Sequence, residues 1–385
     1  MKIAIVGLSI TSSWGNGHAT TYRALVRGLA GRGHDVVFLE RDAPWYAENR
    51  DLPNPPYCRT RVYSAVAELE TRHLAELQSA DVVIVGSYVP DGIAIGDLVH
   101  RRARGMTAFY DIDTPVTLAR LKGAGTEYLA PRQIPRYDLY LSFTGGPTLE
   151  HLEDTYGARL ARPLYCSVDP DLYYPERSPV SSLGAPGTGS SAVRESRRYD
   201  LGYLGTYSED RQPILDRLML RGAREWTSGR FIVAGPQYPD TFNWPVNVER
   251  VVHLAPAKHR QFYNRLRYTL NVTRDDMVKA GYSPSVRLFE AAACGTPIIS
   301  DVWPGIEHFF LPSTEILLAR SPAETLSYLR DIPEPERIEI GRRARARVLR
   351  AHTAAHRAVE LEGYVREARQ SRGPHRAAAV ETLLS

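Results

Sequence analysis

The sequence has little cysteine and no long apolar run. Its three cysteines, Cys58, Cys166 and Cys294, are far apart and show no metal-ligand spacing. An odd number of unpaired cysteines is typical of a reducing compartment, so we expect a cytoplasmic protein. The first apolar run, residues 2–7, is too short for the core of a signal peptide, and no stretch approaches the roughly 18 apolar residues of a membrane helix. We therefore expect no membrane span.

The sequence also lacks a strong excess of either charge. It has 48 Lys and Arg against 44 Asp and Glu, a net charge of +4, and the two signs are interleaved along most of the chain. Nucleic-acid-binding proteins usually carry a concentrated basic surface, so a nucleic-acid partner is not expected. The densest basic run, residues 342–347, lies inside a helical pattern and is interpreted as a solvated helix face.

Short apolar runs alternate with helical patterns along both halves of the chain. The predicted strands of the first half cover residues 3–7, 36–39, 82–85, 107–110 and 139–142. Those of the second half cover residues 201–204, 230–235, 251–253, 269–273, 297–300 and 315–318. Apolar strands separated by helices are typical of a parallel sheet covered on both faces. The predicted fold class is therefore α/β, with two doubly wound, Rossmann-like domains and a ligand cleft between them at the carboxyl ends of the strands.

The length of the chain fits two domains better than one, because single cores rarely grow to 385 residues. We predict an N-terminal domain over 1–170, a linker over 171–199, a C-terminal domain over 200–350 and a helical segment over 351–385. The linker is expected to be partly flexible, because residues 178–198 are rich in Ser, Gly and Pro and almost free of large apolar side chains.

Residues 283–301 form the most informative stretch. Ser283 is a good helix N-cap, Pro284 suits the first helical position, and Gly295 ends the predicted helix. Glu290 lies among apolar neighbours, where an unpaired carboxylate is costly, so it needs partners. A ribose diol offers two donors, and Arg287, one helical turn away, offers an ion pair. The local pattern leaves both interpretations open.

The run from Glu290 to Ile299, EAAACGTPII, resembles the signature of GT-B glycosyltransferases in the retaining branch typified by family 4. Residues 276–290 are similar to the CgeB-like (spore maturation) subgroup. Three further segments, 31–36, 168–175 and 352–357, resemble segments of the same proteins in the same order, the last of them a helix that crosses back towards the first domain. The resemblance implies a GT-B fold, a nucleoside-diphosphate sugar as donor, and Glu290 at the ribose of the nucleotide.

The resemblance also assigns a donor site in the second domain. Arg274 and Lys279 flank a strand end, and Arg211 follows the first strand of this domain, where the family contacts phosphate. Such cations can stabilise the leaving diphosphate without a metal ion, so no metal and no cofactor other than the donor substrate is expected. Ser285, Tyr282 and Gly17 complete the predicted donor-site residues. Tyr282 departs from the family pattern, which has a donor-sugar Glu here, so we assign no stereochemistry.

Catalytic candidates lie in the first domain. Gly17 ends a glycine-containing loop after the first strand, and we expect the glycines to allow positive φ and close ligand approach. His18 follows and is predicted as a general base or as a donor to the sugar or acceptor, with helix capping as the structural alternative. Asp111 and Asp113 end another strand and are predicted to take an acceptor or catalytic role, although Asp113 can instead cap the next turn.

The predicted function is metal-independent transfer of a sugar from a nucleoside-diphosphate sugar to an acceptor hydroxyl. The acceptor is left open as a small molecule, a glycan or a polymer, and residues 44–57 are predicted as a loop that covers it. Two alternatives use the same donor: a GT-B-fold sugar-nucleotide epimerase, and a catalytically inactive protein that binds sugar nucleotides or glycans. Glycosylation of DNA or of a protein is a further interpretation, motivated only by the mildly basic charge balance.

Overall fold

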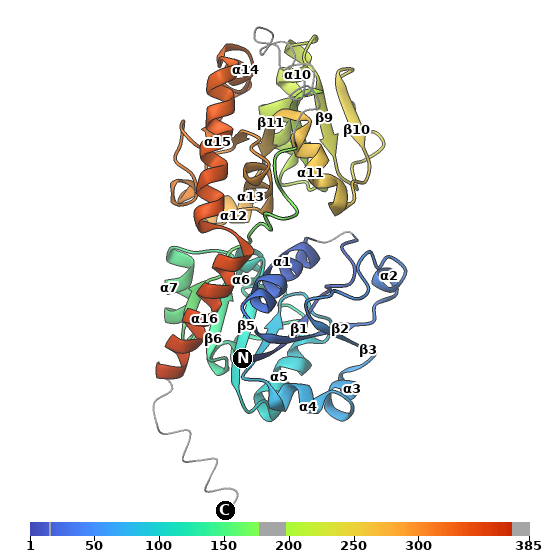
Figure 1. The fold of residues 1–385 in the computed structure, drawn as a ribbon, viewed down its shortest axis with the longest axis vertical. Coiled ribbons are helices and arrows are strands. Elements are labelled where there is room, and N and C mark those ends of the chain that lie inside the picture. The colour runs from blue at the N-terminus through green and yellow to red at the C-terminus, as the bar shows by residue number, and fades with distance from the viewer. Residues whose placement is uncertain (15–16, 177–197, 372–385) are drawn as a thin grey trace, which may run out of the picture. The chain divides into compact units, whose positions relative to one another are not determined.

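The computed structural model describes residues 1–14, 17–176 and 198–371, which form two compact units (Figure 1). The first unit contains Met1–Tyr165 and the segment that starts at Ala354, and the second contains Cys166–Thr353. Each unit is built on one parallel sheet with helices, which confirms the predicted α/β fold class. Of the predicted flexible segment 178–198, all but Arg198 lies outside the described residues.

The first unit has a seven-stranded sheet in the order β3-β2-β1-β4-β5-β6-β7, with every neighbouring pair parallel. Its strands are β1 (Lys2–Gly7), β2 (Asp35–Arg41), β3 (Arg59–Tyr63), β4 (Val82–Gly86), β5 (Met106–Asp111), β6 (Leu139–Ser142) and β7 (Ala161–Pro163). The five inner strands follow the predicted apolar runs. Strands β3 and β7 were not predicted, because the first is mostly polar and the second has only three residues.

The helices of the first unit connect its strands in sequence. They are α1 (His18–Gly31), α2 (Pro44–Ala47), α3 (Val66–Thr71), α4 (Leu74–Ser79), α5 (Gly92–Arg102), α6 (Thr114–Leu121), the 3-10 helix η1 (Pro131–Arg136), α7 (Pro147–Asp154) and the C-terminal α16 (Ala354–Ser371). Helix α16 lies beside α1, although more than 300 residues separate them (Figure 1). Gly28 allows this approach, since a Cβ atom there would lie 2.5 Å from the carbonyl oxygen of Ala354.

The second unit has a six-stranded parallel sheet in the order β10-β9-β8-β11-β12-β13. Its strands are β8 (Tyr199–Leu204), β9 (Phe231–Ala234), β10 (Val248–Val251), β11 (Leu266–Asn271), β12 (Ile298–Ser300) and β13 (Leu317–Leu318). The predicted strand at 251–253 is wrong in position. The residues that pair with β9 are Val248–Val251, whereas Val252 and His253 follow the strand and are exposed.

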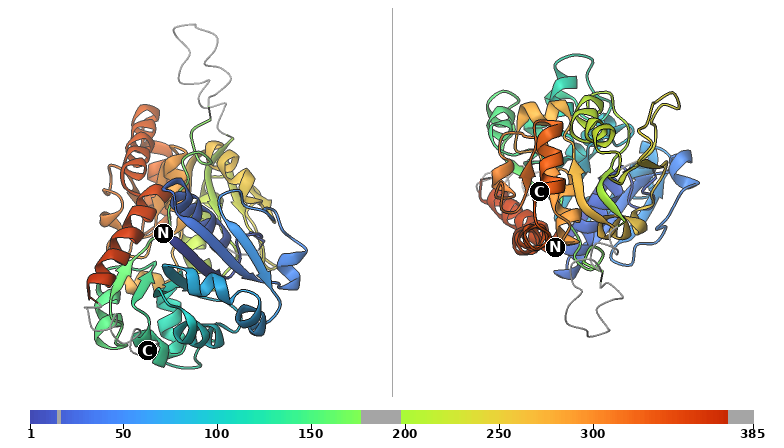
Figure 2. Two further views of the ribbon diagram at one scale, coloured as in Figure 1. Left: turned by 60° about the horizontal axis from the view of Figure 1, so that its bottom comes forward. Right: turned by 90° about the horizontal axis from the view of Figure 1, so that it is seen from above.

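The helices of the second unit are α9 (Gln212–Leu215), the π-helical η3 (Asp216–Leu220), α10 (Arg221–Glu225), α11 (Pro256–Asn264), α12 (Asp275–Ala280), α13 (Val286–Ala293), the 3-10 helix η4 (Ile306–His308), α14 (Pro322–Asp331) and α15 (Glu334–Ala351). Two further views show how each unit layers its helices on its strands (Figure 2). Within the described ranges, no helix is both long enough and apolar enough to cross a membrane.

Helix α13 begins two residues later than the sequence suggested. Ser285 is its N-cap residue, with extended φ and ψ of −89° and 153°, and Val286 is its first residue, so the prediction of Ser283 as the cap is wrong. The hydroxyl of Ser285 donates to Oδ1 of Asn271, 2.7 Å away, and this bond joins the start of α13 to the end of β11. The predicted end at Gly295 is confirmed, since this residue has φ +68°.

Candidate functional site

Three arginine side chains gather at the carboxyl ends of β8 and β11 in the second unit. Arg287, in the first turn of α13, donates its Nε to the carbonyl of Leu204 at the end of β8. Arg211, at the N-cap of α9, donates an Nη2 hydrogen to the carbonyl oxygen of Thr206, at 2.8 Å. Arg274 occupies the N-cap position of α12, and its Nε lies 3.4 Å from Oδ2 of Asp210. The sheet thus presents three guanidinium groups at the edge where doubly wound folds bind ligands.

These cations are close enough to affect one another. Burial lowers the pKa of Arg211, and the positive charges of Arg287 and Arg274 lower it further. Concentrating like charges in a partly buried place is costly unless an anion compensates them. An anionic ligand bound at the cluster would therefore relieve the repulsion between these arginines.

Unused hydrogen-bond donors surround the same cluster. Among the described residues, two buried side-chain atoms of this cluster have no hydrogen-bond partner: Nε of Arg211 and the hydroxyl of Tyr203. Buried polar groups are almost always paired, so unpaired donors in one place indicate a missing acceptor. Each of these atoms can donate to a phosphate oxygen.

Gly205 keeps the space between these groups open. A Cβ atom at this position would lie 2.5 Å from the Tyr203 hydroxyl oxygen and 3.1 Å from Nη2 of Arg287. Gly235, at the end of β9, has φ +149°, and a Cβ there would lie 2.1 Å from the carbonyl oxygen of Gly205. The ends of β8 and β9 thus approach each other through glycine backbone, a common arrangement where a ligand contacts the main chain.

Of the other predicted donor-site residues, Ser285 contacts this cluster, and Lys279 and Tyr282 have surroundings of their own. Ser285 joins it, because Nη1 of Arg287 lies 3.4 Å from its hydroxyl oxygen. Lys279 is exposed on α12, and none of the described contacts connects it to the arginines. Tyr282 has φ +47° and donates its backbone N–H to the carbonyl of Pro304, at 2.7 Å. Its ring lies against Gly305, where a Cβ atom would lie 2.5 Å from Cδ1 of the tyrosine.

Glu290 is buried, with 2% of its surface exposed, and has protein partners. Its Oε2 accepts a hydrogen bond of 3.0 Å from the hydroxyl of Tyr263 and lies 3.7 Å from Nδ1 of His259. Burial raises the pKa of the Tyr173 hydroxyl, and the nearby Glu290 raises it further. Pairing of Glu290 with Arg287 is wrong, because that guanidinium extends to the end of β8. Contact of Glu290 with a ribose stays a prediction.

The first unit brings His18 and Asp113 together through Tyr88, which the sequence analysis missed. The hydroxyl of Tyr88 donates to Oδ2 of Asp113 at 3.2 Å, and the His18 ring meets the Tyr88 ring edge-on, with centroids 5.2 Å apart. The three residues follow β1, β4 and β5, three neighbouring strands of the sheet. Tyr88 has φ +62°, an uncommon conformation for a residue with a side chain, and such strain is often found at functional sites.

The surroundings of His18 favour its neutral form. Burial lowers the pKa of the imidazole, and the Asp113 carboxylate opposes this shift. Nδ1 of His18 is buried and has no hydrogen-bond partner among the described residues. A neutral imidazole beside a carboxylate can accept a proton from a hydroxyl group. Asp113 is the N-cap residue of α6, as the capping alternative predicts, but its side chain makes no cap hydrogen bond, so capping does not occupy the carboxylate.

Asp111 lies beneath this group and is fully buried. Its Oδ1 accepts from the Thr117 hydroxyl at 2.9 Å and from the Asp113 backbone at 3.3 Å, and its Oδ2 accepts from the Tyr140 hydroxyl at 2.6 Å. Burial raises its pKa to about 6 against these hydrogen bonds. Because the carboxylate is enclosed by protein, we revise its expected role from contact with the acceptor to positioning of Asp113.

Gly17 does not use the conformational freedom for which it was singled out. It is the N-cap residue of α1, with φ −84° and ψ −9°, values that any residue adopts. A Cβ atom there would meet nothing within 4 Å. The expectation of positive φ at Gly17 is therefore wrong, and a donor contact by this residue stays a prediction.

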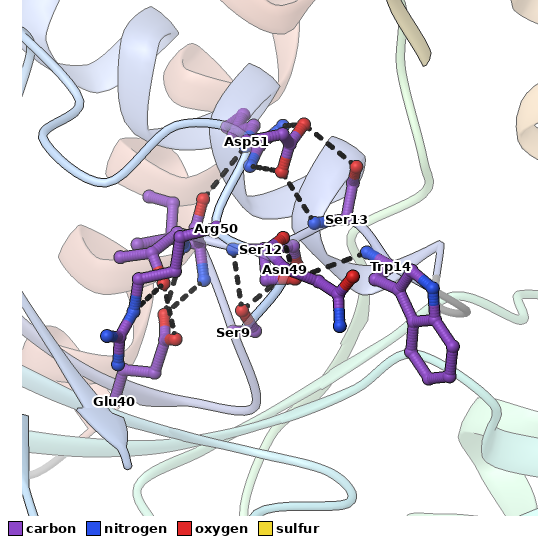
Figure 3. Close-up of polar contacts among 11 residues, drawn as sticks. Ser9, Ser12, Ser13, Trp14, Glu40, Asn49, Arg50 and Asp51 are labelled. Carbon is purple, nitrogen blue, oxygen red and sulfur yellow. Dashed lines mark hydrogen bonds and ion pairs between the residues drawn. The ribbon is translucent and has the colours of Figure 1, made fainter. Parts of the chain in front are cut away.

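Two carboxylates that the sequence analysis did not select hold the loop before α1 (Figure 3). Glu40, at the end of β2, accepts from the backbone of Ile10 at 2.7 Å and from the backbone and hydroxyl of Thr11 at 3.0 and 2.6 Å. Asp51 accepts from the backbone and hydroxyl of Ser13, both at 2.9 Å, and forms a bidentate pair with Arg23. A charged residue directly after a buried apolar strand was the available signal for Glu40.

Comparisons with known proteins agree with this architecture. Residues 211–363 match a family model described as "Glycosyl transferase-like". A search of curated protein sequences finds no match. Over 95% of the chain, the structure is similar to sucrose-phosphate synthase from Thermosynechococcus elongatus, with 15% identity, 98% coverage of that chain and a TM-score of 0.64.

Two further neighbours have 12% identity over 95% of this chain. The Anabaena protein HepE, solved with UDP and glucose, is covered over 100% of its chain with a TM-score of 0.65. An α-glucosyltransferase solved with UDP-glucose and DNA containing an abasic site is covered over 99% with a TM-score of 0.68. The predicted glycosyltransferase class is confirmed at the level of this domain match. The chain therefore has the GT-B fold of these structures, and its residues 211–363 are similar to the glycosyl transferase-like family model.

Proposed function

We propose that this protein transfers a sugar from a nucleoside-diphosphate sugar to an acceptor hydroxyl. In this proposal the second unit binds the donor, with the diphosphate at Arg211, Arg274 and Arg287. The first unit provides the acceptor side, with His18 and Asp113 near the reacting hydroxyl.

The observation that carries the proposal is the charge arrangement around Gly205. Arg287 lies beside Gly205, the charges of Arg287 and Arg274 both act on Arg211, and Nε of Arg211 and the Tyr203 hydroxyl are buried donors without partners among the described residues. A diphosphate supplies both the negative charge and the acceptor oxygens that this arrangement needs, and arginine matches its geometry well. Departure of the nucleoside diphosphate adds negative charge at the same atoms, so the same groups stabilise the transition state.

The proposed chemistry is metal-independent. Three guanidinium groups provide the positive charge that a divalent cation would otherwise bring to the diphosphate. On the acceptor side, neutral His18 or the Asp113 side chain accepts the proton as the acceptor oxygen attacks the anomeric carbon and the nucleoside diphosphate departs. Tyr88 holds the Asp113 carboxylate, and Asp111 holds its backbone.

The finer family placement rests on residues 276–290 alone, whose sequence is similar to the CgeB-like subgroup. The uridine nucleotides named in the descriptions of the neighbours make UDP and UDP-glucose the first donors to test.

Donor binding is tested by calorimetric titration and thermal shift with UDP, GDP, ADP and their glucose derivatives. A ligand that binds the native state raises the melting temperature by mass action. We expect at least one nucleoside diphosphate to bind, and Arg211→Gln and Arg287→Gln each to weaken it by roughly 10–100-fold, the loss of one charged hydrogen bond. The matched control is Arg224→Gln, an exposed arginine on α10 that pairs with Asp216. Absence of any nucleotide response, or equal loss in the control, contradicts the proposal.

A further inference from the structure

Two tryptophans on the first unit are unusually exposed for their size. Trp14, in the loop between β1 and α1, has 49% of its surface exposed, and Trp45, in α2, has 52% exposed. Exposed tryptophan is uncommon, and large apolar side chains on a surface often mark a binding site.

A series of hydrogen bonds connects the backbones of the two tryptophans, and Figure 3 shows the part from Trp14 through Ser12 to Asn49. The Trp14 N–H donates to the Ser12 hydroxyl oxygen at 3.3 Å, and that hydroxyl donates to the Asn49 carbonyl at 2.7 Å. The Asn49 side chain donates in turn to the Trp45 carbonyl at 2.8 Å. The loop from Ser9 to Trp14 is also fixed by Glu40 and Asp51, as described above. Residues 44–57 were predicted as a loop that covers the acceptor. They begin with the short helix α2 and form hydrogen bonds to the Ser9–Trp14 loop, and a covering role stays a prediction.

The charges around the two tryptophans indicate the kind of ligand. Arg23 pairs with Asp51, and Arg50 pairs with Asp42 at 2.7 Å, so both nearby arginines are neutralised. Glu48, exposed next to α2, adds a further negative charge. Surfaces that bind anionic membranes carry unpaired cations beside their aromatic residues, and this one does not among its described residues. Indole rings beside carboxylates and amides suit a sugar, whose C–H faces pack on the rings and whose hydroxyl groups bind the polar side chains.

The position of the tryptophans relates them to the catalytic candidates. Trp45 follows β2, Trp14 follows β1, and Asp113 follows β5, all at the carboxyl edge of one sheet. The order β2-β1-β4-β5 puts three strand spacings between the ends of β2 and β5, roughly 14 Å at the usual separation of neighbouring strands. A ligand that reaches from Trp45 to Asp113 is therefore longer than one sugar ring.

From these observations we propose that Trp14 and Trp45 form a stacking surface for an oligosaccharide acceptor, which extends along the sheet edge towards Asp113. This inference rests on the proposed glycosyltransferase function and specifies its acceptor class. Sugar rings distant from the reacting hydroxyl lie on the two indoles, and that binding free energy helps position the hydroxyl.

The experiment records the indole N–H signals of the full-length, 15N-labelled protein by NMR. The chain has five tryptophans, so Trp226, Trp244 and Trp303, all in the second unit, are internal controls. The probes are the tetrasaccharides of maltose, cellobiose, chitobiose and β-1,4-mannose type, each compared with its monosaccharide. We expect at least one tetrasaccharide to shift the Trp14 and Trp45 signals at concentrations where its monosaccharide shifts neither.

Alanine and phenylalanine variants of the two tryptophans distinguish a loss of stacking from a loss of folding. Trp14→Ala and Trp45→Ala should each weaken that tetrasaccharide by roughly tenfold, whereas Trp14→Phe and Trp45→Phe, which keep an aromatic face, should retain most of the affinity. No response to any tetrasaccharide overturns the inference. Equal loss in the Phe and Ala variants overturns it as well, and so does a response to phosphatidylglycerol vesicles without a response to sugars.

Nucleotide binding distinguishes the failure of this inference from failure of the proposed function. If UDP or another nucleoside diphosphate binds the second unit while no tetrasaccharide perturbs Trp14 or Trp45, the stacking surface is refuted and the donor assignment stands. If tetrasaccharides bind but no nucleotide does, the transferase proposal fails, and the surface is a glycan-binding site of a different kind of protein.

Discussion

Replacement of Glu40 tests whether one buried carboxylate fixes the loop that carries Trp14 and leads to His18. In Glu40→Ala, two backbone N–H groups and one hydroxyl lose their acceptor inside the protein. Each unsatisfied buried donor costs about 1–3 kcal/mol, so the loss of the acceptor for three donors should lower the free energy of unfolding by about 3–9 kcal/mol. Glu40→Gln retains one acceptor oxygen, and we expect a loss of about 1–2 kcal/mol.

The assay is urea unfolding at pH 7 followed by circular dichroism, together with hydrogen exchange of the Ile10 and Thr11 amides. The exchange rates should rise strongly in Glu40→Ala and moderately in Glu40→Gln. Glu48→Ala is the matched control, because Glu48 is exposed on the same unit and exposed substitutions usually change stability by less than about 0.5 kcal/mol. If Glu40→Ala and Glu48→Ala lose similar stability, the argument that Glu40 anchors the loop is refuted.

Four further outcomes are expected. Burial raises the folded-state pKa of Asp111 to about 6 from 3.8, so its carboxylate destabilises the fold as pH rises through that window. The unfolding free energy of the wild type relative to Asp111→Asn should fall by about 2 kcal/mol between pH 4 and pH 7 in urea titrations, and a pH-independent difference contradicts this. Gly205→Ala should abolish calorimetric nucleotide binding, because its Cβ meets Tyr203 and Arg287, whereas Gly123→Ala, with open space around it, should not. Tyr88→Phe should lower the turnover rate about tenfold with little change in donor KM, measured by release of nucleoside diphosphate; an equal effect on both shows a general loss of structure. Excess EDTA should leave sugar transfer unchanged, and a loss restored by Mg²⁺ would refute metal independence.

The fold could be predicted from the sequence because its inner strands are continuous apolar runs. Strand β3 could not, since it reads Arg-Thr-Arg-Val-Tyr and depends on β2 for pairing. The basic residues Arg211 and Arg274 were recognised because they follow predicted strands, and strand ends meet at one edge of a sheet. The contacts between individual side chains at the carboxyl edge of each sheet could not be predicted in the same way.

Arg287 and Tyr88 illustrate the difficulty. Arg287 lies one helical turn from Glu290, so local spacing suggested an ion pair, but the guanidinium reaches the carbonyl of Leu204, 83 residues away in sequence. Tyr88 follows a buried strand with nothing in its neighbours to indicate a left-handed conformation, because tyrosine rarely adopts one. Both assignments depend on tertiary contacts that the periodicity of a sequence does not contain.

The packing of α16 against α1 has a consequence for synthesis. The first unit draws its last helix from residues after Ala354, so the ribosome has translated the whole second unit before this helix exists. Until then, the face of α1 around Gly28 lacks its partner, and the ion pair of Arg32 with Glu362 cannot form. The second unit, continuous in sequence, can fold first. The first unit is thus the last to complete its fold. Until α16 has been made, the face of α1 around Gly28 is exposed, and a chaperone would act at this face during translation.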